Sequence, residues 1–106
     1  MPTLHELYDE GDKLKEAGQL EEAVAKYQEV LSQDPNYALA HSALAVVLTR
    51  LKRHDEAIKH AQAVCQLEPN EPFSFTAMSV TFQRAGKIPE AEDAMASARM
   101  LQAGTA

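Results

Sequence analysis

The sequence predicts an all-α protein, in which three helix–turn–helix units stack into an α–α superhelix, or solenoid. The first observation is a repeat at an offset of 34 residues; alanine, for example, recurs at Ala23, Ala57 and Ala91. The second is that apolar residues follow helical spacing, and no stretch alternates as a strand would. We therefore expect six helices in a single domain over residues 1–106. The three units span about residues 4–37, 38–71 and 72–105.

The first unit carries clear signals for both of its helices. Thr3 and Glu6 form a capping box, with Thr3 as the N-cap and Glu6 at the third helical position. Gly18 ends the first helix, because glycine readily adopts the left-handed conformation found at helix ends. The second helix begins near Leu20 and stops near Pro35, since proline disfavours helix at the residue before it.

The second unit repeats the pattern with a different turn. Asn36 is the expected N-cap of a helix over residues 37–51. Residues 52–54 then turn the chain without the glycine that the other two units have. A helix over residues 55–67 completes the unit.

The third unit opens after Asn70, and its first helix tolerates Pro72 in the first turn. This helix is expected to run to Ala85, where Gly86 breaks it. The last helix is expected to reach about Leu101 before glycine frays its end.

The composition excludes several classes of function. The net charge is −6, and the first unit carries all of it, with nine acidic residues against three basic ones. An acidic chain without a basic stripe binds nucleic acid poorly, but it attracts basic segments of other proteins. No apolar run is long enough to span a membrane, and the N-terminus lacks a secretory signal. A single cysteine, Cys65, fits a reducing compartment, so we expect a cytoplasmic protein.

The units resemble tetratricopeptide repeats, a family of 34-residue helix–turn–helix units. The family pattern combines large and small apolar residues with an alanine, an aromatic residue and a final proline at fixed positions. The residues at these positions are Leu7, Glu10, Gly11, Leu14, Ala23, Tyr27, Val30 and Pro35 in the first unit, His41, Leu44, Ala45, Leu48, Ala57, Ala61, Val64 and Pro69 in the second, and Phe75, Met78, Ser79, Phe82, Ala91, Met95 and Ala98 in the third. Glu10, His41 and Ala61 depart from the pattern, and Ala103 replaces the final proline.

The resemblance implies a non-catalytic module that binds a peptide or helix of another protein. The first helix of each unit would line a concave groove. The groove residues carried over from the family are Tyr8, Asp12, Leu39, Val46, Arg50, Phe73, Val80 and Arg84. This set is apolar in the middle, acidic near the first unit and basic along one edge, so a matching partner would be an apolar segment with a basic group toward the first unit.

One known use of this groove is not expected here. In some members of the family, lysine, asparagine and arginine side chains clamp the acidic C-terminus of heat-shock chaperones by charge-assisted hydrogen bonds. The corresponding positions hold Tyr8, Asp12, Ala43, Phe73 and Ala77, none of which is a clamp residue. Asp12 would repel such a ligand.

Two other functions remain as alternatives. The last helix lacks a capping element with a polar outer face, so Met95 and Met100 could form a homodimer surface. An enzyme using Cys65 is the more distant alternative, because a cysteine beside the core position Val64 is expected to be a buried, inert thiol. The four histidines lack the close helical spacing of a zinc pair, and no phosphate-binding glycine loop is present. We therefore expect no metal and no cofactor.

Overall fold

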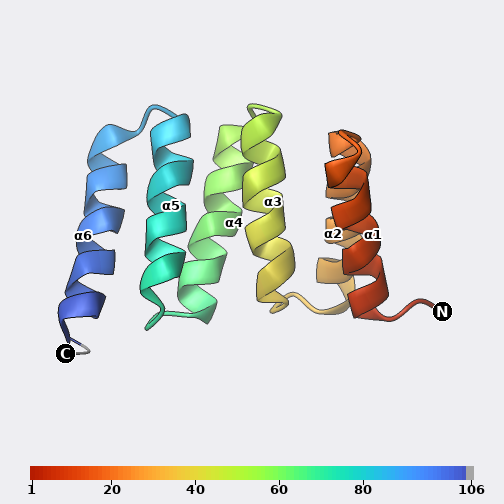
Figure 1. Cartoon of the computed structure of the whole chain (residues 1–106), viewed down its shortest axis with the longest axis horizontal. Coiled ribbons are helices and arrows are strands. Elements are labelled where there is room, and N and C mark those ends of the chain that lie inside the picture. The colour runs from red at the N-terminus through yellow and green to blue at the C-terminus, as the bar shows by residue number, and fades with distance from the viewer. Residues whose placement is uncertain (105–106) are drawn as a thin grey trace.

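The computed structural model describes residues 1–104. Within these residues the chain forms six α-helices and no strand, which confirms the expected fold class. Figure 1 shows them side by side along the molecule, with α1 and α6 at opposite ends of the long axis. The helices are α1 (Leu4–Glu16), α2 (Leu20–Gln33), α3 (Ala38–Arg50), α4 (His54–Leu67), α5 (Pro72–Arg84) and α6 (Ile88–Gly104).

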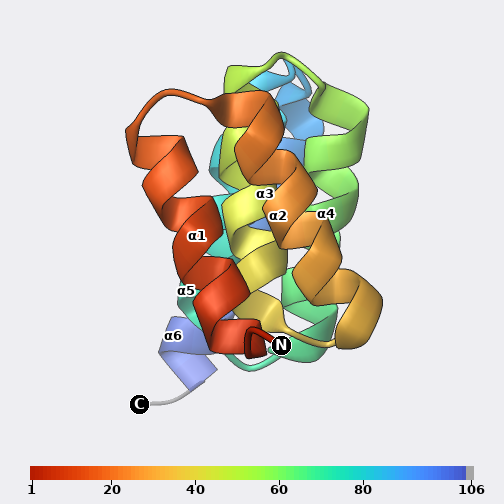
Figure 2. The ribbon, with the colours of Figure 1, turned by 90° about the vertical axis from the view of Figure 1, so that its right-hand side faces the viewer.

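The helices pack as consecutive antiparallel pairs, one pair for each unit. The pairs are α1 with α2, α3 with α4, and α5 with α6, and they are joined by the contacts α2–α3 and α4–α5. The first helices of the units also contact one another, α1 with α3 and α3 with α5. Figure 2 looks along this stack from its N-terminal end, with α1 and α2 in front. The helices α1, α3 and α5 therefore form one continuous side of the molecule.

The hydrophobic core runs between the pairs rather than in one central cluster. Tyr27 and Val24 of α2 are buried against Leu44 and Val47 of α3. At the next junction Ile58 of α4 belongs to a cluster with buried residues of α5 and α6. Each unit thus covers the apolar face of the one before it, as expected when stacked repeats share their core.

The capping prediction is confirmed in the first unit and wrong in the second. Thr3 and Glu6 form the expected capping box, with each side chain accepting a backbone N–H of the other residue at 3.1 Å. The prediction that Asn36 caps α3 is wrong. The N-cap is Tyr37, because the Asn36 N–H instead donates to the Asp34 side chain at 3.1 Å and belongs to the preceding turn.

The other ends shift by a few residues. In the third unit, which was expected to open after Asn70, Glu71 is the N-cap of α5, and its carboxylate accepts the Phe73 N–H at 3.1 Å. This helix ends at Arg84, one residue earlier than expected, whereas α6 continues three residues past Leu101 to Gly104. The expected end of the third unit at residue 105 lies outside the described residues.

The turn within each unit uses one left-handed residue. In the first and third units it is glycine, Gly18 with φ 81° and Gly86 with φ 78°. In the second unit the equivalent residue is Lys52, with φ 62°. The turn geometry is therefore the same in all three units, and Lys52 adopts a conformation that costs a non-glycine residue free energy.

Among residues 1–104, no helix combines the length and the apolar character that crossing a membrane requires.

Candidate functional site

The side formed by α1, α3 and α5 carries apolar residues that the core does not use. On α3 these are Leu39 and Val46, which are 56% and 49% exposed. On α5 the equivalent residues, 34 positions later, are Phe73 and Val80, which are 75% and 45% exposed. A spacing of seven residues places each pair on one face of its helix, and the two helices are in contact. The four side chains therefore occupy matched positions on neighbouring helices.

Two arginines continue the same register. Arg50 and Arg84 follow Val46 and Val80 by four residues, both are exposed, and neither belongs to any ion pair within residues 1–104. They place two positive charges at one edge of this side. We refer to the surface made by Leu39, Val46, Phe73, Val80, Arg50 and Arg84, with Tyr8 and Asp12 of α1, as the α1–α3–α5 face.

The α1 part of this face is polar and acidic. The positions that hold Leu39, Val46 and Arg50 in the second unit hold His5, Asp12 and Glu16 in the first. The face therefore changes along the stack from acidic residues on α1 to exposed apolar side chains on α3 and α5.

Asp12 also holds α1 against α2. Its Oδ1 atom accepts a hydrogen bond from the Tyr27 hydroxyl at 2.5 Å and lies 3.9 Å from the Lys15 Nζ atom. Burial, followed by the bond to Asp12, raises the pKa of the Tyr27 hydroxyl far above its ordinary value, so the hydroxyl stays protonated and donates. Binding to a partner through Asp12 stays a prediction.

Tyr8, like Asp12, lies on this face and also packs within the structure. Its ring is half-buried, with its centroid 5.7 Å from that of Tyr27 and 5.9 Å from that of Tyr37. Burial and then the negative charge of Asp12 raise the pKa of its hydroxyl. Tyr8 thus packs against both helices next to α1 and offers only part of its ring to a ligand.

The small residues of the face differ from one another in exposure. Ala43 is buried, whereas Ala77, its equivalent one unit later, is exposed. Tyr8, Asp12, Phe73 and these two alanines occupy the positions of the chaperone clamp. None of them is a lysine, arginine or asparagine, so no cationic or amide donor for paired carboxylates lies there.

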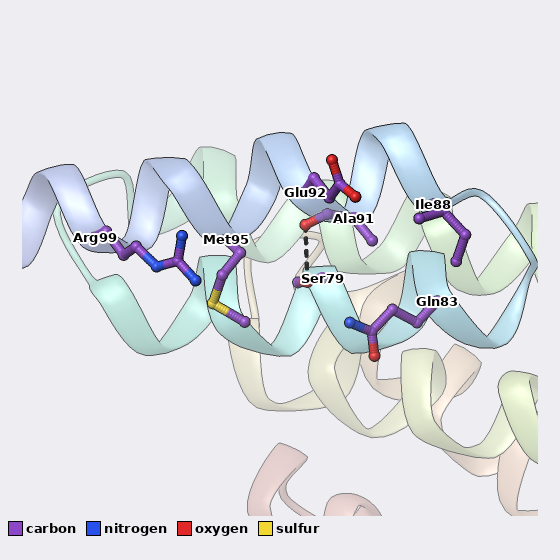
Figure 3. A pocket seen from close by; sticks show the side chains of 7 residues that line it. All are labelled: Ser79, Gln83, Ile88, Ala91, Glu92, Met95 and Arg99. Atoms are coloured by element: carbon purple, nitrogen blue, oxygen red, sulfur yellow. Dashed lines mark hydrogen bonds between the residues drawn. The ribbon is translucent and has the colours of Figure 1, made fainter.

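The two methionines singled out for self-association lie in different places. Met95 lines a groove between α5 and α6, as Figure 3 shows. Met100 is 73% exposed and is not among the residues that line this groove. Self-association through these two methionines stays a prediction.

A contact between two histidines was not predicted from the sequence. The Nδ1 atoms of His41 on α3 and His60 on α4 lie 2.9 Å apart, and the His41 Nε2 atom lies 2.7 Å from the Pro35 carbonyl oxygen. Because a carbonyl only accepts, His41 carries its proton on Nε2, and His60 donates from Nδ1. Burial and then His41 lower the pKa of His60. Residues 19 apart on different helices give no local spacing signal, which is why the pair was missed.

The remaining chemical candidates are accounted for by packing. Cys65 is buried, and its Sγ atom lies 3.4 Å from the Ser74 carbonyl oxygen and 3.8 Å from the Met78 sulfur. Burial and then Glu68 raise the pKa of this thiol, which keeps it in the unreactive protonated form at neutral pH. No group of three or more potential metal ligands comes together within residues 1–104.

Several solved structures share this fold. The chain matches the structure "MamA MSR-1 C2" with a TM-score of 0.84 at 24% identity, over 98% of its own length and 60% of that chain. The translocator chaperone SycD of Yersinia enterocolitica matches with a TM-score of 0.84 at 22% identity, over 95% of this chain and 76% of that one. The second repeat domain of Spaghetti (RPAP3), bound to the HSP90 peptide SRMEEVD, matches with a TM-score of 0.81 at 20% identity, over 92% and 91% of the two chains.

These identities establish similarity of fold, and the chain spans only about three-fifths of the length of the MamA structure. No curated protein matches the sequence. The sequence profile of the tetratricopeptide repeat family matches residues 8–72, which is more than half of the chain. Together with six helices that stack in consecutive antiparallel pairs, this match shows that the chain belongs to the tetratricopeptide repeat family.

Proposed function

We propose that this chain is a non-catalytic protein-interaction module, which binds a peptide or helix of another protein along the α1–α3–α5 face. The observation that carries the proposal is the matched exposure of Leu39, Val46, Phe73 and Val80 on two contacting helices. Single exposed apolar residues are common, but a group at equivalent positions indicates a site of interaction. The structural neighbours support this role only in general terms, since the matching repeat domain of RPAP3 is bound to a peptide.

The four apolar side chains would supply most of the affinity. Burying one such side chain fully is worth about 1.5–3 kcal/mol, so covering the exposed halves of four of them is enough for a moderate affinity. The matching ligand is an amphipathic helix, or an extended segment with alternate apolar residues, that lies across α3 and α5.

Charge would set the direction of the ligand. The acidic residues on α1 favour a basic group at that end, whereas Arg50 and Arg84 favour a carboxylate along the other edge. The absence of clamp residues at Tyr8, Asp12, Ala43, Phe73 and Ala77 separates this ligand from the acidic peptide bound to RPAP3. We propose a protein partner in the cytoplasm, with no nucleic acid, membrane or cofactor.

The test is affinity capture from the source cell with a matched pair of variants. Phe73→Glu combined with Val80→Glu places two charges in the middle of the face. Both side chains are exposed, so the fold should be retained, which circular dichroism checks. Met100→Glu is the control, because Met100 is as exposed as Phe73 but lies on α6.

We expect the double variant to lose partners that the parent chain and Met100→Glu both retain. For a partner obtained in this way, the dissociation constant measured by calorimetry should rise about tenfold or more, since two apolar contacts are replaced by desolvated charges. Equal capture by all three proteins would exclude this face as the binding site.

A further inference from the structure

The groove between α5 and α6 lies on the side of the third unit that faces away from the second. Its volume is about 630 Å3. The residues that matter for its chemistry are Ser79 and Gln83 of α5 and Ile88, Glu92, Met95 and Arg99 of α6. Figure 3 shows these side chains along the groove, with Met95 between Glu92 and Arg99.

The same positions in the other units are covered by a following helix. On α2 these positions hold Val24, Tyr27 and Leu31. Val24 and Tyr27 belong to the core cluster that α2 shares with α3, and Leu31 packs against it. Their equivalents on α4, Ile58, Ala61 and Cys65, are all buried. The antiparallel neighbours that cover them are α3 and α5. The groove on α6 is thus the place where this fold packs an antiparallel helix.

Two of the groove positions on α6 hold charged residues where the equivalent positions on α2 and α4 hold apolar ones. Glu92 stands where Val24 and Ile58 are buried, and Arg99 stands where Leu31 and Cys65 pack. Both charged residues are exposed, and neither takes part in an ion pair within residues 1–104. Apolar surface remains beside them, since Ile88 is 49% exposed and Met95 is only partly buried.

This charge pattern is complementary to itself. Glu92 and Arg99 are seven residues apart, so they lie two turns apart on one side of α6, with Met95 between them. When two identical helices pack antiparallel, they cross at the same residue of each helix. A residue that precedes this crossing point on one helix then faces a residue that follows it on the other helix. Glu92 lies three residues before Met95 and Arg99 four residues after it, so each charge is presented to its opposite on a second copy when the two helices cross near Met95.

We propose that a second copy of this chain docks in this groove, with the two α6 helices antiparallel across a two-fold axis near Met95. Glu92 of each copy faces Arg99 of the other, and the Met95 side chains pack together at the centre. A two-fold interface must be self-complementary in this sense, whereas a helix of an unrelated partner has no reason to match such a pattern. The interface is separate from the α1–α3–α5 face, so dimer formation and partner binding can succeed or fail independently.

The test measures the oligomeric state of the full chain by sedimentation equilibrium and light scattering, over concentrations that reach the millimolar range. We expect the parent chain to form a dimer. Glu92→Arg places an arginine opposite Arg99 of the other copy in both contacts of the interface. Arg99→Glu places a glutamate opposite Glu92 of the other copy in both contacts. Each variant should raise the dimer dissociation constant about tenfold or more, because two favourable pairs become two repulsive ones.

Mixing the two single variants tests whether residue 92 of one copy faces residue 99 of the other. In a mixed pair, Arg at position 92 of one chain meets Glu at position 99 of the other, and the second contact has the same opposite charges. The mixture should therefore form a heterodimer at concentrations at which each variant alone is mostly monomeric. The double variant Glu92→Arg with Arg99→Glu should recover a homodimer for the same reason.

Asp93→Arg is the matched control, because Asp93 is an exposed residue of α6 that does not line this groove. It should leave the dimer intact, as should Phe73→Glu with Val80→Glu. A parent chain that stays monomeric at every concentration would overturn the proposal. A dimer that persists in both single variants, or a mixture of the two that remains monomeric, would also overturn it.

Discussion

The first and third units use the same two core positions in different ways. In the first unit the pair is Gly11 and Tyr27, and the tyrosine is fully buried. A Cβ atom on Gly11 would lie only 2.7 Å from the Cε1 atom of the Tyr27 ring. In the third unit the pair is Ser79 and Met95, where Ser79 donates to the Ala91 carbonyl at 2.8 Å and Met95 lines an open groove.

The difference shows how a repeat adjusts to its neighbours. The Tyr27 ring belongs to the core cluster that α2 shares with α3, and glycine opposite it makes the required room. The second unit fills the same two positions with Ala45 and Ala61, both buried. The position is aromatic in the first unit only. In each unit, the size of its side chain is limited by the residue opposite it and by the helix that covers it.

The largest expected effect follows from removing the tyrosine. Tyr27→Ala should lower the free energy of unfolding by about 3–5 kcal/mol, because it leaves a cavity between α1, α2 and α3 and frees the Asp12 carboxylate. Met95→Ala at the equivalent position should cost about 1–2 kcal/mol, since Met95 is only partly buried. Chemical denaturation measures both variants. Equal losses would contradict the difference between the two units.

The next effect comes from filling the space that glycine leaves. Gly11→Ala should destabilise the chain by about 1–2 kcal/mol, because the added methyl group meets the Tyr27 ring and its better helix propensity offsets only part of the strain. Combined with Tyr27→Ala it should cost little more, since the first unit then has the Ala–Ala pair of the second. Simple additivity of the two losses in thermal or urea unfolding would show that the residues do not interact.

A smaller effect of opposite sign is expected in the second unit. The Nδ1 atom of His54 is buried without a hydrogen-bond partner, whereas the equivalent residues in the first and third units are Leu20 and Ile88. His54→Leu should stabilise the chain by about 1 kcal/mol, because it removes the cost of an unsatisfied buried polar atom. A loss of stability in denaturant titrations would indicate a partner for this nitrogen.

The smallest effect concerns the turn. Lys52→Gly gives the second unit the left-handed glycine that the others have, and should raise stability by up to about 1 kcal/mol. Gly18→Lys, which makes the reverse change in the first unit, should lower it by a similar amount. Differential scanning calorimetry of the two variants measures the change, and equal signs for both would refute the assignment of strain to this residue.

Much of this architecture could be predicted from the sequence, because a repeat constrains the same positions three times. The six helices and the turn residues follow from the 34-residue offset. The exposed positions of Leu39, Val46, Phe73 and Val80 follow from the family's groove positions carried over to this sequence. The helix starts could not be predicted as closely, because the Asp34 and Glu71 side chains accept backbone N–H groups beside the starts of α3 and α5.

Contacts between helices could not be predicted in the same way. The Tyr27–Asp12 hydrogen bond and the His41–His60 pair join residues of different helices, and they depend on rotations and side-chain conformations that spacing does not determine. The groove between α5 and α6 was anticipated only as an exposed helix face. Its self-complementary charges become meaningful only once Glu92, Met95 and Arg99 are seen along the same side of the groove.

The contacts between neighbouring helices also determine how the molecule should respond to force. Within residues 1–104, every pair of helices in contact is adjacent along the chain or separated by one helix, and α1 and α6 lie at opposite ends of the stack. Tension applied through the termini therefore acts along the stack and can detach one helix pair without disturbing distant ones. Such local connectivity also favours rapid refolding, on the order of microseconds to milliseconds. Stretching should give several small extensions that reverse readily, rather than a single abrupt rupture.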